Sequence, residues 1–250
     1  MGYGGNTPCV EVRHNDDAPI VIDGGTGIRW LGQKLVAEQA VKIHVFLSHF
    51  HYDHIQGIPF FPPLYNPKAQ VNFYSAETPA RLEELLHAQV RTPYFPVRMP
   101  LAENYYHQIG PEGVRLGEVQ VVPVPLKHSD PVTGFQIRTP AGTIVYASDH
   151  EHGIPGFDEG LVRLAKDADF LIYDAHFTPD EYQNFAGWGH STWLEATKFA
   201  RAANVGRLAL FHHAPDHDDE FMRRVVRNAR QQFQPTDAAR EGWTVRVRKR

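Results

Sequence analysis

Six residues, HFHYDH at positions 49–54, contain three imidazoles and a carboxylate directly after the apolar run at 43–47. If the backbone first stays extended, His49 and His51 point to the same face of the chain. A turn after His51 would then bring the aspartate and the last histidine round to a second position nearby. This density of ligands predicts a metal site with two positions at the end of a strand. The alternative is a polar loop that is merely rich in histidine.

The HFHYDH sequence resembles the His-x-His-x-Asp-His signature of the metallo-β-lactamase superfamily. This resemblance implies three further ligands, each placed where an apolar run ends. The runs at 119–126, 143–148 and 208–211 end just before His128, Asp149 and His212. By analogy, one ion would be held by His49, His51 and His128, the other by Asp53, His54 and His212, with Asp149 between them.

Each of the three later ligands has an alternative in the sequence. His128 has ordinary turn residues as neighbours, and Asp149 is also suited to cap a turn or a helix. His213 competes with His212, which we favour because the family's ligand directly follows the strand. Other histidines are expected at the surface, on apolar faces or around the ligands rather than among them, namely His14, His44, His87, His150, His152 and His217.

The segment GWGHST at 187–192 precedes a helical pattern at 193–204, for which Ser191 or Thr192 is a good N-cap. Its His190, together with Asp174 after the apolar run at 169–173, resembles a pair in the transfer-RNA 3′-processing endonucleases and class II cyclic-nucleotide phosphodiesterases. In those enzymes a carboxylate orients a non-ligand histidine that serves the leaving oxygen. The catalytic residues implied are His190, Asp174 and Asp53. Alternatively, His190 only neighbours a helix cap and Asp174 only ends a strand.

The ligand types predict the cofactor. Two divalent ions roughly 3.5–4 Å apart make hydroxide available at neutral pH and neutralise charge that develops on an ester or phosphoryl oxygen. Imidazole and carboxylate ligands suit Zn²⁺, although Mn²⁺ and Fe²⁺ tolerate similar ligands. We therefore expect two divalent ions, with zinc favoured.

Composition and pattern predict one domain over residues 1–250. Hydrophobic residues make up 42% of the chain, and no linker, repeat or low-complexity break divides it. The order of strands then helices, twice, suits an α+β fold, the four-layer αβ/βα sandwich of the metallo-β-lactamase superfamily. Relative to family members of similar sequence, the usual first strand before Tyr3 is missing, which could leave a sheet edge unpaired.

The pattern predicts these elements in detail. Helices are expected at 31–39, 79–91, 161–165, 193–204 and 218–233. Strands are expected at 10–13, 20–23, 43–47, 71–74, 119–125, 135–139, 143–147, 169–173, 207–211 and 243–247.

Charge and cysteine content limit the compartment and the partners. A net charge of −4 gives no general attraction to nucleic acid, so a long nucleic acid is disfavoured as a partner. Cys9 is the only cysteine, which excludes an intrachain disulfide and favours a reducing, cytoplasmic compartment. No apolar stretch approaches the roughly 20 residues of a membrane span, and no signal-peptide pattern opens the chain.

The spacing between two of the expected ligands indicates the substrate class. His128 and Asp149 are only 21 positions apart, whereas the endonucleases carry a long flexible insertion there that grips RNA. We therefore predict a dinuclear phosphodiesterase with a small substrate, for example a cyclic nucleotide. A lactonase or other carboxylic ester hydrolase is the alternative enzyme, and a non-catalytic metal-binding module is the alternative outside enzymes. The proline-rich segment at 59–100 fits a lid, a homodimer surface or an exposed scaffold loop.

Overall fold

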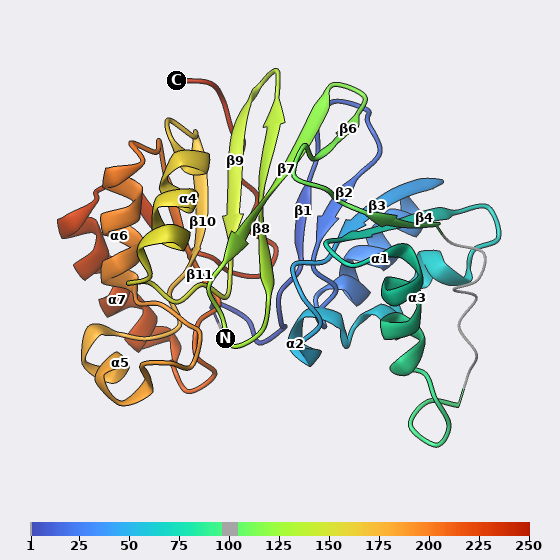
Figure 1. Cartoon of the computed structure of the whole chain (residues 1–250), viewed down its shortest axis with the longest axis horizontal. Coiled ribbons are helices and arrows are strands. Elements are labelled where there is room, and N and C mark those ends of the chain that lie inside the picture. The colour runs from blue at the N-terminus through green and yellow to red at the C-terminus, as the bar shows by residue number, and fades with distance from the viewer. Residues whose placement is uncertain (1, 97–104) are drawn as a thin grey trace. The chain divides into compact units, whose positions relative to one another are not determined.

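The computed structural model describes residues 2–96 and 105–250. The chain divides into two compact units, which we call the N-terminal unit, Asn6–Gly110, and the C-terminal unit, Met1–Gly5 with Pro111–Arg250. Figure 1 labels most elements of both. Each unit is built on its own sheet.

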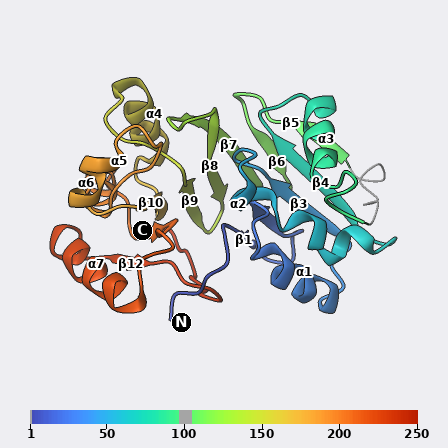
Figure 2. The ribbon, with the colours of Figure 1, turned by 90° about the horizontal axis from the view of Figure 1, so that it is seen from below.

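The N-terminal unit contains a five-stranded sheet in the order β1-β2-β3-β4-β5. β1 and β2 pair antiparallel, and the later pairs are parallel. The helices α1 and α3 cover one face, where their leucines and isoleucines pack on the valines and phenylalanines of β3 and β4 (Figure 2). The strands are β1 (Val10–Val12), β2 (Ile20–Ile22), β3 (Lys42–Phe46), β4 (Gln70–Ser75) and β5 (Tyr105–Gln108), and the two helices are α1 (Ile28–Ala37) and α3 (Pro79–Ala88).

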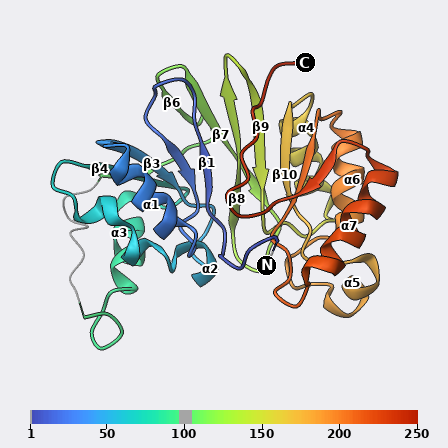
Figure 3. The same cartoon turned by 180° about the vertical axis from the view of Figure 1, so that it is seen from behind.

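The C-terminal unit contains a seven-stranded sheet in the order β12-β11-β10-β9-β8-β7-β6. β6 to β9 form an antiparallel meander, and β9 to β12 are parallel. Figures 2 and 3 show α4, α6 and α7 packed beside this sheet, where they share its apolar core. The strands are β6 (Val114–Leu116), β7 (Val119–Leu126), β8 (Val132–Thr139), β9 (Gly142–Ala147), β10 (Phe170–Asp174), β11 (Leu208–Phe211) and β12 (Thr236–Ala238). The helices are α4 (Pro155–Ala165), α5 (Pro179–Phe185), α6 (Trp193–Ala202) and α7 (Asp219–Gln232).

The α+β class and the five predicted helices are confirmed, but the strand expected at 243–247 is wrong. β12 pairs with β11 instead and takes the edge position of the sheet. The C-terminal tail is held by single contacts, such as the Lys249 amide to the Ala141 carbonyl at 2.7 Å and the Arg250 amide to Asp169 at 3.0 Å. Isolated anchors of this kind form no ladder. The pattern also missed α5, β5 and β6, which are short.

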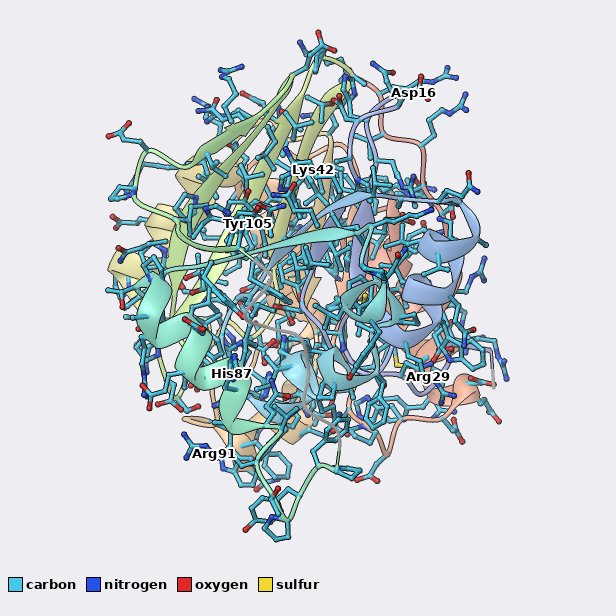
Figure 4. The ribbon with its side chains drawn as sticks, turned by 90° about the vertical axis from the view of Figure 1, so that its right-hand side faces the viewer. Asp16, Arg29, Lys42, His87, Arg91 and Tyr105 are labelled. Atoms are coloured by element: carbon cyan, nitrogen blue, oxygen red, sulfur yellow. The ribbon has the colours of Figure 1, made fainter. Side chains whose placement is uncertain are left out.

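The proline-rich segment at 59–100 is largely scaffold where the structure describes it. β4 and α3 belong to the sheet and its helical cover, while Phe60 and Tyr94 remain exposed. Residues 97–100 lie outside the described residues. Figure 4 shows His87 on α3, so His87 belongs to the helices that cover the sheet and not to the HFHYDH loop. The same view shows Arg29 on α1, the other covering helix.

Among residues 2–96 and 105–250, no helix combines the length and the apolar character that crossing a membrane requires.

Candidate metal centre

The HFHYDH loop of the N-terminal unit turns where the sequence predicted. His51 is extended (φ −63°, ψ 148°) and caps the single helical turn α2 (Tyr52–Ile55). The turn brings the loop's candidate ligand side chains together. The ring of His49 lies 4.4 Å from that of His51 and 4.3 Å from that of His54, measured between centroids, and His54 Nε2 lies 3.4 Å from Asp53 Oδ2.

Asp23, directly after β2, forms hydrogen bonds with this loop and with the residue before it. Its side chain is fully buried and accepts hydrogen bonds from the Ser48 amide at 2.8 Å and the Ser48 hydroxyl at 2.9 Å. The same carboxylate lies 2.8 Å from His54 Nδ1. Because a carboxylate only accepts hydrogen bonds, His54 carries its proton on Nδ1 and directs the Nε2 lone pair towards Asp53. Asp23 therefore sets the tautomer of a candidate ligand.

Two glycines allow the loop to pack this closely. A Cβ on Gly25 would lie 2.3 Å from the Asp53 carbonyl oxygen, and a Cβ on Gly57 would lie 2.0 Å from the Gly25 carbonyl oxygen. Real Cβ atoms do not approach backbone oxygens this closely. Gly25 and Gly57 are thus required at these positions for steric reasons.

The C-terminal unit gathers a second group of candidate site residues at the ends of parallel strands. Asp149 follows β9, Asp174 ends β10 and His212 follows β11, and parallel neighbours bring these ends to one edge of the sheet. His212 Nε2 lies 3.5 Å from Asp149 Oδ1. Asp149 and His212 both adopt left-handed backbone angles (φ 57° and 58°), which turn each chain sharply as it leaves its strand. We call Asp149, Asp174, His190 and His212 the strand-end cluster, because one ligand atom of each lies within 4.8 Å of the others.

His128 and His213 differ in where their rings point. His128 Nδ1 lies 2.6 Å from the Gly189 carbonyl oxygen and therefore donates to it, while Nε2 lies 3.9 Å from Asp149 Oδ1. His213 Nε2 instead lies 3.1 Å from the Ala239 carbonyl oxygen, and burial lowers the pKa of His213 to about 4. This geometry places His128 and His212, but not His213, beside Asp149.

Asp174 and His190 form a buried pair. His190 Nδ1 lies 2.8 Å from Asp174 Oδ2, and the same carboxylate accepts the amides of Asp149 at 3.0 Å and Ser191 at 2.9 Å. Burial by itself would raise the pKa of Asp174, but His190 outweighs burial and lowers this pKa. Burial by itself would lower the pKa of His190, but Asp174 outweighs it and raises this pKa. The pair therefore favours an ionised carboxylate beside a protonated imidazole.

A family model described as the Beta-lactamase superfamily domain matches residues 19–213. The chain belongs to this superfamily. It is similar to Ribonuclease Z of Myxococcus xanthus (strain DK1622), with 27% identity over 81% of this chain and 80% of that protein. The expected superfamily, its ribonuclease Z branch and the class of metal-dependent hydrolase are confirmed.

Solved structures agree on the fold. The metallo-beta-lactamase fold protein YhfI from Bacillus subtilis has a TM-score of 0.73 and 21% identity, covering 97% of this chain and 95% of that one. A diphosphatase from the PhnP family has a TM-score of 0.70 and 20% identity, covering 98% of this chain and 86% of that one. The metallo-β-lactamase fold expected from the sequence is thereby confirmed.

The donor atoms within each unit suit divalent ions. Nδ1 of His54 donates to Asp23 and Nδ1 of His128 donates to the Gly189 carbonyl, so Nε2 carries the lone pair of each ring. Asp53 and Asp149 add carboxylate oxygens close to those rings. Neutral imidazole and carboxylate without thiolate suit zinc, manganese or iron.

Sequence reasoning missed two residues around the strand-end cluster. His176 Nδ1 lies 2.9 Å from the His212 carbonyl oxygen, and its ring stacks on His190 with centroids 4.4 Å apart. Burial lowers the pKa of His176 to about 4. Its position two residues after Asp174, where β10 ends, was the available signal. The second residue is Glu151, which is 7% exposed. It lies two residues after Asp149, but the sequence does not show that its partners are in the loop at 187–189.

Proposed function

We propose that this chain is a dinuclear phosphodiesterase that acts on small phosphodiesters, of which cyclic nucleotides are one class. The observation that carries the proposal is the His190 and Asp174 pair beside Asp149 and His212. A protonated imidazole next to a metal ligand suits the departure of an alkoxide, which needs a proton.

The proposed ligands follow the family pattern in the sequence. They run through both units, and the matched residues 19–213 do so too, so we treat residues 1–250 as one functional domain. One ion would be held by His49, His51 and His128, the second by Asp53, His54 and His212, and both by Asp149.

In the proposed reaction, the chain's own residues donate the proton and orient the proton donor. Bound divalent ions supply activated water and neutralise charge on the phosphate. His190 holds its Nδ1 proton against Asp174, so the Nε2 proton is the one that would pass to the leaving oxygen. The hydrogen bonds from the Asp149 and Ser191 amides hold the Asp174 carboxylate in place, and this orients the imidazole.

The proposal of a small substrate rests on the interval between His128 and Asp149. β8 and β9 fill this interval, and β8 pairs with β7 over residues 132–138 and with β9 over residues 135–139. A two-residue turn joins β8 to β9. This compact hairpin has no RNA-gripping arm, and the net charge of −4 adds no general attraction for a polyanion.

One observation favours a second candidate. The similarity to Ribonuclease Z of Myxococcus xanthus covers most of both proteins, which supports transfer-RNA processing as the alternative activity. A lactonase or other ester hydrolase would use the same ligands without needing His190. A metal-binding module without turnover would need neither the pair nor an open ligand position.

The test is a substrate panel with zinc-loaded and manganese-loaded protein. The panel contains bis(p-nitrophenyl) phosphate, 2′,3′-cyclic and 3′,5′-cyclic nucleotides, a precursor transfer RNA and a set of lactones. We expect turnover of bis(p-nitrophenyl) phosphate and of at least one cyclic nucleotide, with RNA cleaved more slowly. Turnover of lactones alone, or of nothing, would contradict the proposal, and faster cleavage of the RNA would contradict the small substrate.

A further inference from the structure

Glu151 lies where three segments of the proposed site meet. It is two residues after Asp149, its amide donates to the Lys127 carbonyl at 2.7 Å directly before His128, and its side chain reaches the loop that precedes His190. The carboxylate is buried. Its hydrogen bonds go to Lys127, Gly187, Gly189 and Tyr182, so we expect its effect on the site to pass through these residues.

The carboxylate of Glu151 accepts three hydrogen bonds. Gly187 donates its amide to Oε1 at 2.5 Å, Gly189 donates its amide to Oε2 at 3.0 Å, and the Tyr182 hydroxyl donates to Oε1 at 2.8 Å. Both oxygens are thereby used, and amides to an ionised acceptor form the stronger class of hydrogen bond. Tyr182 comes from α5, which lies at one end of the helical layer in Figures 1 and 3.

The loop needs such a tether because of its own backbone. Gly187 and Gly189 adopt φ values of +91° and +88°, which only glycine adopts at little cost, so the chain here has the greatest freedom when unheld. Gly189 cannot be replaced, since a Cβ there would lie 2.2 Å from His128 Nδ1. A freely moving Gly189 would carry His190 with it.

Gly189 connects the tether to the site. Its amide donates to Glu151, its carbonyl accepts from His128 Nδ1 at 2.6 Å, and the next residue is His190. The orientation of His128 and the position of His190 thus depend on one peptide segment. We propose that Glu151 is a positioning residue that fixes both the ligand tautomer of His128 and the placement of His190.

This inference rests on the proposed function for its kinetic readout, but two of its readouts do not involve activity. Hydrogen–deuterium exchange at residues 187–190 reports the tether, and zinc affinity by chelator competition reports His128. The kinetic readout compares bis(p-nitrophenyl) phosphate, which has a good leaving group, with a cyclic nucleotide, which has a poor one. If the wild type hydrolyses neither, the proposed function fails while the first two readouts still test Glu151.

The decisive variant is Glu151→Gln, which keeps the shape but replaces one acceptor by a donor that faces an amide. We expect faster hydrogen–deuterium exchange at 187–190. We also expect a loss of zinc affinity of about 10- to 100-fold, as for other residues that orient ligands. The loss of kcat should be larger on the cyclic nucleotide than on the p-nitrophenyl ester. Tyr182→Phe removes one of the three hydrogen bonds and should shift the same readouts in the same direction by less. It serves as the test if Glu151→Gln does not fold.

The matched control is Asp169→Asn. Asp169 is also a carboxylate that accepts two backbone amides, from Thr143 at 2.8 Å and Arg250 at 3.0 Å, but it directly precedes β10, whereas Asp174 ends that strand. We expect it to lower stability without changing exchange at 187–190 or the ratio of the two substrates. Wild-type exchange and zinc affinity in Glu151→Gln, or the same pattern of changes in Asp169→Asn, would overturn the inference.

Discussion

The HFHYDH loop and the strand-end cluster hold their ligands in different ways. In the loop, the ligands are neighbours in sequence, and one buried carboxylate, Asp23, fixes a histidine tautomer from directly beneath. In the strand-end cluster, the ligands come from separate strand ends, and their positions depend on hydrogen bonds between segments, above all those to Asp174. The comparison teaches that a contiguous motif brings its candidate ligands together through its own turn, whereas an assembled cluster depends on hydrogen bonds between strand ends and loops.

The largest expected effect is a loss of kcat when His190 is replaced. It distinguishes a role in proton transfer from a role in ion binding. His190→Ala should lower kcat on a cyclic nucleotide by about 10²- to 10⁴-fold, the usual contribution of a general acid, because the alkoxide would leave without a proton. The loss should be much smaller for bis(p-nitrophenyl) phosphate, and the metal content should stay at the wild-type level. Steady-state kinetics on both substrates and plasma mass spectrometry measure this. An equal loss on both substrates would remove His190 from the role of acid.

A smaller effect contrasts the two supporting carboxylates. Asp23→Asn should reduce zinc affinity by about 10- to 100-fold, because His54 loses the acceptor that sets its tautomer, and should leave the ratio of the two substrates unchanged. Asp174→Asn should mainly change that ratio, since it releases His190. Chelator competition measures the zinc affinity of both variants, and the two-substrate assay measures the ratio of activities. If both variants lost metal and neither changed the ratio, the contrast between loop and cluster would be broken.

The smallest effect concerns α5, which leads into the loop of His190. Glu181 accepts from the Thr178 amide and hydroxyl and lies 2.9 Å from His217 Nε2. Burial by itself would raise the pKa of Glu181, but these hydrogen bonds outweigh it and lower this pKa below its ordinary value. A lowered carboxyl pKa stabilises the fold above the unfolded value, and this contribution is lost as the pH falls through the folded value.

Glu181→Gln should therefore cost stability at neutral pH, by about 0.3–1 kcal/mol, the usual contribution of a negative charge near a helix N-terminus. The difference from wild type should shrink as the pH falls below the ordinary pKa of a glutamate and through the lowered pKa of Glu181. Denaturant unfolding of both proteins across this range measures it. A difference that stays constant with pH would show that the charge of Glu181 contributes nothing.

The same contrast explains how much could be predicted from sequence. The turn after His51 follows from a local pattern, and it forms as predicted. Asp149, Asp174 and His212 follow apolar runs, so their positions at strand ends were predictable, although their proximity needed the order of the strands. Glu151 was not predictable, because its partners are 36 and 38 residues away in a loop with no periodic pattern.

Edges of the sheets were the least predictable part of the fold. The apolar alternation at 243–247 is typical of a strand, but β12 occupies the position beside β11. The tail is instead held by contacts such as that of the Arg207 guanidinium over the Trp243 ring at 5.2 Å. Which of two short segments pairs with an edge depends on such tertiary contacts, and these cannot be read from periodicity.

The most direct test of the account is the number of metal ions per chain, measured by plasma mass spectrometry together with bis(p-nitrophenyl) phosphate hydrolysis for wild type and Asp149→Ala. The account predicts two ions per wild-type chain, and activity that disappears in Asp149→Ala, since that carboxylate is proposed to bind both ions. One ion or none in the wild type after zinc or manganese is added, with no turnover, would contradict a dinuclear hydrolase.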